Sequence, residues 1–183
     1  MLLLFASFSL SAQTPNTSDT YQIIFGFNGT ALDNSGTVTN GTQVVTVNPD
    51  SKNKNQHWKF RDAGNGYYHI IDVNSQKALE VAGGKTDNGT PIQLWDFHGG
   101  PNQKWKLADT GGGKEFRLQC EQTGKYIDVP SSGSDVKLHQ SDMGGYNQVV
   151  KFVKVGGPAS NVAANELVYR VKCKANNRFW HYD

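Results

Sequence analysis

The sequence predicts an all-β protein built from three copies of one unit. The phrase Asn-Gln-x-Trp occurs at residues 55–58 and 102–105 and returns in degraded form at 147–150, with spacings of 47 (102 − 55) and 45 (147 − 102) residues. A strand-like triplet opens each unit at Tyr21, Tyr68 and Phe116, with spacings of 47 (68 − 21) and 48 (116 − 68) residues. The 20 glycines and the scarcity of long helical patterns are typical of short strands joined by tight turns. Two independent landmarks with one period indicate a repeat protein.

Residues 1–20 are expected to be an export signal and a linker. The run Met1–Ala12 is apolar and uncharged and ends in small residues, as secretory signals do. It is shorter than the roughly 18 apolar residues of a membrane span. Cleavage near Ala12 would give a secreted or extracytoplasmic protein, and the absence of a basic residue before the run suggests that the gene starts further upstream. The alternative is a frayed hydrophobic terminus.

The first unit has an outward face with one acid. Successive side chains of a strand point to opposite faces, so apolar residues at every second position identify the buried face. Applied to Leu32–Asn34 and Val44–Val47, this rule turns three side chains outward: Asp33, Val45 and Val47. This face has an acid but no aromatic ring and no amide.

The middle unit shows the alternation most clearly. The inward positions are apolar: Leu79, Val81, Ile92 and Leu94. The outward positions are Glu80, Gln93 and Trp95. Between the two strands, Asn88-Gly89 is a strong turn signal that brings them side by side. A carboxylate, an amide and a large ring should therefore gather on one face.

In the last unit the same offsets are applied to Ile127–Val129 and Val136–His139. They turn outward Asp128, Lys137 and His139. In this alignment Lys137 stands where the middle unit has its amide, and His139 where it has its ring.

The closing phrase of each unit has a structural part and a part that reaches the outward face. The glutamine amides are expected to hold backbone loops: Gln56, Gln103 and Gln148. Trp58 and Trp105 are expected to fill a shared centre. The asparagines one step earlier should project toward the outward face or else stabilise turns: Asn55, Asn102 and Asn147.

The C-terminal end predicts a further unit. Residues 169–179 match residues 116–126 position by position, at a spacing of 53 (169 − 116). We expect a linker at 156–168 and the start of a truncated repeat at 169–183, which implies a longer parent protein; a docking C-terminal strand is the alternative. Cys120 and Cys173 occupy equivalent positions, where a small hydrophobe would fit the core. Export would permit a disulfide between them, and the sequence leaves that pairing open.

Residues 21–155 resemble the ricin-type, or QxW, β-trefoil family of carbohydrate-binding domains. The middle unit matches the family pattern almost throughout. The resemblance implies a trefoil of twelve strands in three lobes, 21–60, 61–108 and 109–155, around a pseudo three-fold axis. It also implies up to one sugar pocket per lobe and no cofactor.

The resemblance also implies roles for individual residues. A carboxylate grips two sugar hydroxyls, a ring stacks on the sugar, and amides complete the polar ring. In the middle lobe these roles fall on Glu80, Gln93, Trp95 and Asn102. In the last lobe they fall on Asp128, His139 and Asn147, with Lys137 at the amide position. The family usually has Asp where this chain has Glu80, and Val47 offers no ring, so we expect the middle lobe to bind best, then the last, with the first silent.

The predicted function is non-catalytic carbohydrate binding by a secreted module, appended to a larger polysaccharide-active protein. The alternative is a protein-binding β-trefoil, such as a protease inhibitor or a cytokine-like ligand. Glycoside hydrolysis needs carboxyl groups about 5 to 9.5 Å apart, whereas Glu80 and Asp128 belong to different lobes. A net charge of +2 does not suggest nucleic-acid binding, and the histidines and cysteines are not spaced as metal ligands.

Overall fold

The computed structural model describes residues 14–131, 136–142 and 144–156. The predicted export signal, most of the second linker, and the fourth unit with Cys173 lie outside the described residues. Their assignments therefore stay predictions.

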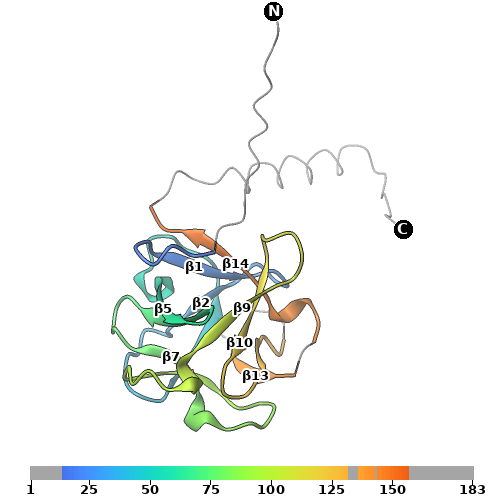
Figure 1. Ribbon diagram of the computed structural model, residues 1–183. Helices are drawn as coiled ribbons and strands as arrows, with labels where there is room; N and C mark the ends of the chain where they lie inside the picture. The colour runs from blue at the N-terminus through green and yellow to red at the C-terminus, as the bar shows by residue number, and fades with distance from the viewer. Residues whose placement is uncertain (1–13, 132–135, 143, 157–183) are drawn as a thin grey trace, which may run out of the picture.

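Six strands form a closed barrel. They are β1 (Tyr21–Phe25), β5 (Trp58–Gly64), β6 (Tyr67–Asp72), β9 (Trp105–Asp109), β10 (Phe116–Cys120) and β14 (Val149–Lys154). All pairs are antiparallel and follow the circuit β1-β14-β10-β9-β6-β5-β1. In Figure 1, β1 and β14 run beside each other above β9 and β10, and β7 and β13 lie at the opposite end.

Three hairpins cap one end of the barrel. They pair β2 (Ala31–Asp33) with β4 (Val45–Val47), β7 (Ala78–Val81) with β8 (Ile92–Trp95), and β11 (Tyr126–Asp128) with β13 (His139–Ser141). Two short strands link hairpins, because β3 (Thr42–Gln43) pairs with β8 and β12 (Val136–Lys137) pairs with β4. The third link is a bridge between Pro91 and His139.

A ring of backbone hydrogen bonds marks the pseudo three-fold axis. The N–H of Val44 donates to Ile92 O, that of Ile92 to Leu138 O, and that of Leu138 to Val44 O, each at 3.1 Å. Val44, Ile92 and Leu138 are thus equivalent residues of the three lobes. The barrel, the three hairpins and this ring confirm the predicted β-trefoil. The described residues form fourteen strands where the resemblance implied twelve, because β3 and β4, like β12 and β13, are two pieces of one segment.

Short 3-10 helices precede the barrel strands that close each lobe. They are η1 (Lys54–Gln56), η3 (Pro101–Gln103) and η4 (Tyr146–Gln148), and a fourth, η2 (Ala82–Gly84), follows β7. The first three contain the repeated Asn-Gln pair. Each therefore places an asparagine and a glutamine next to a hairpin.

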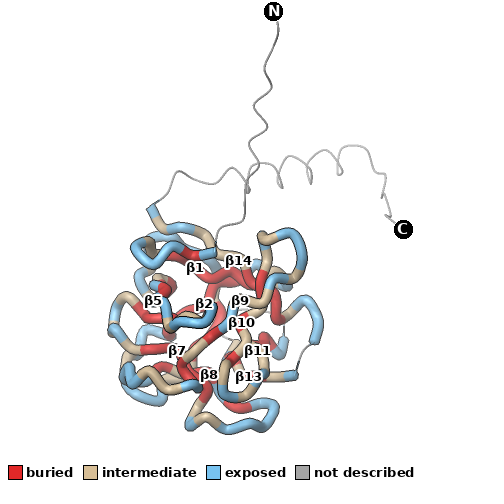
Figure 2. Tube along the Cα trace, viewed as in Figure 1, coloured by how far each residue is buried: buried red, intermediate tan, exposed pale blue. Residues whose placement is uncertain are grey.

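The core confirms the predicted tryptophan anchors. Trp58 and Trp105 are fully buried, and Figure 2 shows buried segments along the strands with exposed segments at the turns. Trp58 Nε1 donates to Leu32 O at 3.0 Å, and Trp105 Nε1 donates to Leu79 O at 2.9 Å. Each indole therefore joins the barrel to a hairpin. Cys120 is also buried, and this burial raises the pKa of its thiol.

Two matching polar groups join neighbouring lobes. In the first, which we call the middle clamp, Lys77 Nζ bonds Asp96 Oδ1 and Asn40 Oδ1. In the second, the last clamp, Lys125 Nζ bonds Asp142 Oδ1 at 2.7 Å and Asn88 Oδ1 at 2.6 Å. The lysine holds the pKa of Asp96 and of Asp142 below its usual value, with help from the asparagine.

This lowered pKa predicts a pH-dependent contribution to stability. Asp142→Asn should lower the unfolding temperature slightly at pH 7, because the ionised carboxylate is stabilised only in the folded state. A lowered folded-state pKa gives stabilisation that is present above the unfolded value of 3.8 and is lost as the pH falls through the folded value. The difference between variant and wild type should therefore shrink with acidification below about pH 4. Thermal unfolding followed by circular dichroism from pH 7 to pH 2 would measure it.

Lys125→Met is the control for this prediction, because it removes the cation of the same pair. It should reproduce the loss at pH 7 and its disappearance in acid. A difference that is constant with pH would contradict the ionic origin of the stabilisation.

Candidate functional site

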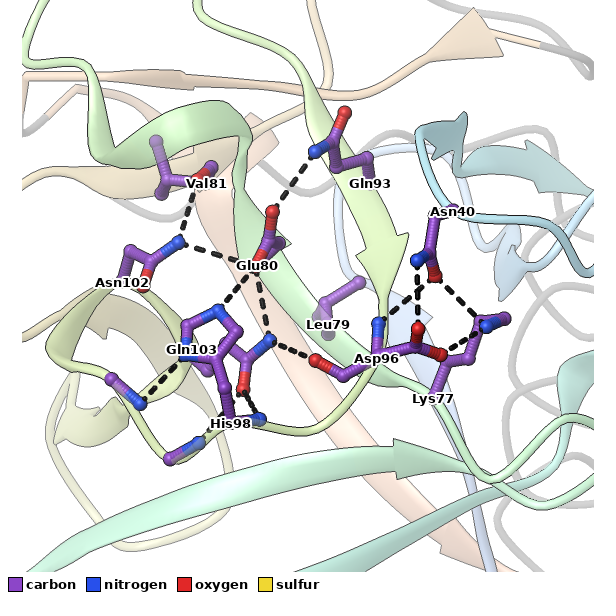
Figure 3. Close-up of polar contacts among 12 residues, drawn as sticks. Asn40, Lys77, Leu79, Glu80, Val81, Gln93, Asp96, His98, Asn102 and Gln103 are labelled. Atoms are coloured by element: carbon purple, nitrogen blue, oxygen red, sulfur yellow. Dashed lines mark hydrogen bonds and ion pairs between the residues drawn. The ribbon is translucent and has the colours of Figure 1, made fainter.

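A buried carboxylate lies at the centre of the middle-lobe site. Glu80, on β7, is 3% exposed. Its Oε1 accepts from Gln93 Nε2 at 2.9 Å, and its Oε2 accepts from Asn102 Nδ2 at 3.2 Å and Gln103 Nε2 at 3.0 Å (Figure 3). The structure therefore brings together three of the four predicted residues of this lobe. It corrects the expectation that the acid faces water, because the amides from β8 and η3 cover it.

Local structure explains how these groups meet. The register of β7 and β8 sets Glu80 opposite Gln93, and η3 carries Asn102 and Gln103 beside them. Asn102 Nδ2 also donates to Val81 O at 3.2 Å, which holds η3 against the hairpin. Among the described residues only Gln93 donates to Glu80 Oε1. Since a carboxylate oxygen has two lone pairs, one is left for a ligand hydroxyl.

Gln103 links the acid to the loop that follows β8. Its Nε2 donates to Asp96 O at 3.0 Å, and its Oε1 accepts from the backbone N–H groups of His98 and Gly99. This confirms the predicted loop-holding role of the repeated glutamine. It also adds a contact with Glu80 that the sequence analysis did not assign.

His98 is a site residue that the sequence analysis missed. Its Nδ1 accepts from the Gly100 N–H at 3.1 Å, so the proton of a neutral ring lies on Nε2, which is 3.3 Å from Glu80 Oε2. A larger residue at Gly100 would displace the His98 ring, because a Cβ atom would lie 2.8 Å from that ring and 3.0 Å from Asn102 Oδ1. No periodicity marks a loop residue such as His98. Only the sequence His98-Gly99-Gly100, next to the Asn-Gln phrase, could have drawn attention to it.

Trp95 presents an aromatic surface on the same face of β8 as Gln93. It ends β8, opposite Ala78 and two residues after Gln93, and is 39% exposed. Phe97 is similarly exposed at 43%, but its ring packs edge-on against His69 and lies 4.7 Å from the guanidinium carbon of Arg61. Trp95 is therefore the better candidate for a ligand platform.

His69 supports the site from the barrel. Its Nδ1 lies 2.9 Å from Gln103 O. Burial lowers the pKa of His69, which favours the neutral ring. A neutral ring that donates through Nδ1 holds η3 in place.

The last lobe repeats the acid and its amides. Asp128 is 7% exposed, and Asn147 Nδ2 donates to its Oδ1 at 3.0 Å while Gln148 Nε2 donates to its Oδ2 at 2.8 Å. Asn147 also donates to Val129 O, as Asn102 does to Val81 O. A shorter carboxylate thus reaches equivalent amides.

The strand register corrects the predicted roles of His139 and Lys137. Asp128 pairs with His139 as Glu80 pairs with Gln93, so His139 occupies the amide position and its Nε2 lies 3.4 Å from Asp128 Oδ1. Ser141, opposite Tyr126, takes the ring position. Lys137 lies on β12 opposite Val45, beside the first lobe. The predicted alignment of this segment was wrong by two residues.

The first lobe has a cavity beside its acid. Asp33 accepts from the Ser35 N–H at 2.7 Å and from Asn53 Nδ2 at 3.3 Å. Val45 and Val47 occupy the amide and ring positions, as predicted. A cavity of about 500 Å³ opens here, and its lining includes Asp33, Val45, Val47, Asn53 and Asn55. The prediction that this lobe is silent stays untested.

The sequence of this chain matches one protein family along most of its length. The model of the ricin-type β-trefoil lectin domain-like family matches residues 6–95, 54–141 and 101–182. The chain belongs to this family. The three overlapping matches start 48 (54 − 6) and 47 (101 − 54) residues apart, which is the period of the repeat.

Relatives of this ricin-type chain include a plant lectin and solved trefoils. The Ricin B-like lectin EULS3 of Arabidopsis thaliana is 34% identical over 88 residues, and the match spans 43% of this chain but only 27% of that protein. The designed three-fold symmetric protein ThreeFoil is 32% identical with a TM-score of 0.70, over 73% of this chain and 97% of its own. An exo-β-1,3-galactanase of Clostridium thermocellum is also 32% identical, with a TM-score of 0.68, over 78% of this chain and 32% of the enzyme. The Macrolepiota procera ricin B-like lectin, 18% identical with a TM-score of 0.65 over 76% of this chain and 98% of its own, supports the fold alone.

The described part of this ricin-type chain holds neither a cluster of metal-ligand side chains nor a helix that could span a membrane. No group of three or more His, Cys, Asp or Glu side chains there is arranged to hold a metal ion. No helix among those residues has the length and apolar character needed to cross a bilayer.

Proposed function

We propose that this chain binds carbohydrate without catalysis and that the middle lobe is its main site. The observation that supports this most is a partly exposed indole, Trp95, two residues along β8 from the strand partner of Glu80, a carboxylate that three amides hold in place. A pyranose has hydroxyls at its rim and C–H groups on a face. A charged acceptor next to a flat apolar surface matches both features.

The expected affinity is low for a single lobe. A hydrogen bond to a charged group contributes about 1.5–3 kcal/mol, and an aromatic contact about 0.5–1.5 kcal/mol beyond its burial. Association costs at least about 4 kcal/mol in lost translational and rotational freedom. These contacts and the apolar surface that the ligand buries have to exceed that cost, so we expect a Kd no better than about 1 mM, near −4 kcal/mol, for one lobe. Several lobes or a second module would raise the apparent affinity through avidity.

The ranking of the lobes follows from their side chains. In the last lobe Asp128, His139 and Asn147 provide an acid, an imidazole and an amide, but Ser141 stands where the middle lobe has Trp95. We propose a weaker site there. The first lobe, with valines at both strand positions, is proposed not to contribute.

We further propose that the chain is a secreted module of a larger polysaccharide-active protein. The apolar residues 1–12 support export. A place within a larger polysaccharide-active protein is supported by the similar galactanase, because this chain covers only 32% of that enzyme. Detection of the protein in the medium of the source cells, cleaved near Ala12, would test the first part.

A glycan array that includes β-1,3-galactan and xylan tests the function itself. Retention of at least one glycan is expected. Binding to no glycan would contradict the proposal and favour the protein-binding alternative, which a pull-down from the source organism's secreted proteins would then test.

Trp95→Ala should abolish retention on the selected glycan while the protein stays folded. The ring is 39% exposed, so its loss removes the platform without opening a cavity in the core. Affinity chromatography and circular dichroism would measure the two effects. Phe27→Ala is the matched control, because Phe27 is an exposed ring, at 45%, outside the middle-lobe hairpin. Unchanged retention of Trp95→Ala would remove the middle lobe from the proposal.

A further inference from the structure

We propose that the middle clamp of Asn40, Lys77 and Asp96 positions Trp95, so that the middle-lobe site is assembled from two lobes. Asn40 belongs to the first lobe, whereas Lys77 and Asp96 belong to the middle lobe. This inference rests on the proposed function, because it assigns Trp95 the role of ligand platform. The three clamp residues are positioning residues and need not touch the ligand.

The clamp fixes the peptide bond that follows Trp95. The N–H of Asp96 donates to Asn40 Oδ1 at 3.0 Å, and Asn40 Nδ2 donates to Asp96 Oδ2 at 2.8 Å. Lys77 Nζ binds both partners, to Asn40 Oδ1 at 2.8 Å and to Asp96 Oδ1 (Figure 3). Backbone and side chain of Asp96 are therefore held at once, and the residue before it has little freedom to rotate about its backbone.

The first lobe also supports the ring of Trp95. Gly41 follows Asn40 directly, and its N–H donates to Leu94 O at 2.9 Å. A Cβ atom on Gly41 would lie 3.8 Å from Trp95 Cζ3, and its φ of +85° suits glycine. The edge of the indole thus lies close to Gly41, and Trp95 keeps 39% of its surface exposed.

Asp96 connects the clamp with the carboxylate group of the site. Its carbonyl oxygen accepts from Gln103 Nε2 at 3.0 Å, and the same Nε2 donates to Glu80 at 3.0 Å. Figure 3 shows Asp96 between the Glu80 group and the pair Asn40–Lys77. The acid and the ring of the site are therefore held relative to each other through one residue.

The last clamp repeats this arrangement without a ring. Asn88 Nδ2 donates to Asp142 Oδ2 at 2.8 Å, and the Asp142 N–H donates to Asn88 Oδ1 at 3.1 Å. The aspartate side chain is 70% exposed in both clamps, and the lysine side chain 17%. The residue before Asp142 is Ser141, however, where the middle lobe has Trp95. The chain therefore contains a matched control, a clamp of the same chemistry that holds no platform.

The test compares Lys77→Met with Lys125→Met in the full chain. The readout is acrylamide quenching of Trp95 fluorescence. The signal of the other tryptophans is removed by subtracting the fluorescence of the same variant that also carries Trp95→Ala. Lys77→Met should make Trp95 clearly easier to quench, and Lys125→Met should not. Both variants should lower the unfolding temperature by similar amounts, because they remove similar surface ion pairs.

Glycan binding supplies the second readout. On the glycan that the wild type retains best, Lys77→Met should weaken binding by between about 2- and 10-fold, the range of one favourable aromatic contact. Lys125→Met should bind like the wild type, and Lys77→Arg should recover most of the loss. Equal quenching and equal affinity in the two methionine variants would overturn the inference. If no glycan binds at all, the proposed function fails, and the quenching comparison still decides whether the clamp positions the ring.

Discussion

Trp105→Ala is expected to lower the free energy of unfolding by about 3–5 kcal/mol, as truncation of a buried aromatic side chain does. Trp105 is fully buried, and its Nε1 donates to Leu79 O. The substitution opens a cavity and leaves a buried carbonyl without that donor. Since the whole free energy of unfolding of a domain is about 5–15 kcal/mol, the loss is a large fraction of it.

Denaturant unfolding monitored by circular dichroism would measure this loss. Trp95→Ala serves as the control, because its ring is partly exposed and should change the free energy of unfolding far less. Leu79 neighbours Glu80 on β7, so Trp105→Ala should also weaken ligand binding. A loss of about 0.5 kcal/mol or less, the range of an ordinary surface substitution, would contradict the anchoring role of the indole.

The period of the sequence predicts the fold well because both landmarks, the closing Asn-Gln-x-Trp phrase and the opening strand triplet, contain residues with the same structural role in every unit. Trp58 and Trp105 begin barrel strands just after a 3-10 helix. The amide of the repeated glutamine donates to a loop carbonyl in every unit, from Gln56, Gln103 and Gln148. Strand alternation predicts the inward residues of the middle lobe. Leu79, Leu94 and Ile92, for example, are fully buried.

The last lobe shows where alternation fails. Gln140 is fully buried at the position of Leu94, because its Nε2 donates to Lys85 O and Asp87 O and its Oε1 accepts from Thr123. A satisfied polar side chain in the core resembles a surface residue in sequence. The predicted alignment therefore ended the apolar pattern at Leu138, two residues early, and moved His139 to the ring position.

Contacts between distant segments could not be predicted from periodicity. Glu80 lies on the expected face, but residues 13 to 23 positions away cover it. The middle clamp joins Asn40 to Asp96 across 56 positions. Alternation shows toward which side a residue points and says nothing about the loops that come to lie over it.

Glu80→Gln is expected to abolish ligand binding by the middle lobe. One hydrogen bond from a sugar hydroxyl to the free lone pair of Oε1, at about 1.5–3 kcal/mol, corresponds to a loss of about 10- to 100-fold, which takes a millimolar site out of the measurable range. The substitution also disturbs the hydrogen bonds between residue 80 and the amides around it. Both carboxylate oxygens accept from amide N–H groups, so an NH₂ in either place would face a donor. A decrease of about 1–3 kcal/mol in the free energy of unfolding is expected as well.

Two control variants show whether the loss comes from the missing carboxylate charge and whether it is specific to the middle lobe. Glu80→Asp keeps the carboxylate and should retain most of the binding, since Asp128 accepts from the equivalent amides of Asn147 and Gln148 at 3.0 and 2.8 Å. Asp33→Asn removes the matching acid of the first lobe, where Val47 replaces the ring, and should leave binding unchanged. Isothermal titration with the glycan selected on the array would measure all three. Wild-type affinity in Glu80→Gln would show that the carboxylate only holds the amides in place, and the indole of Trp95 would then have to recognise the sugar with other polar groups.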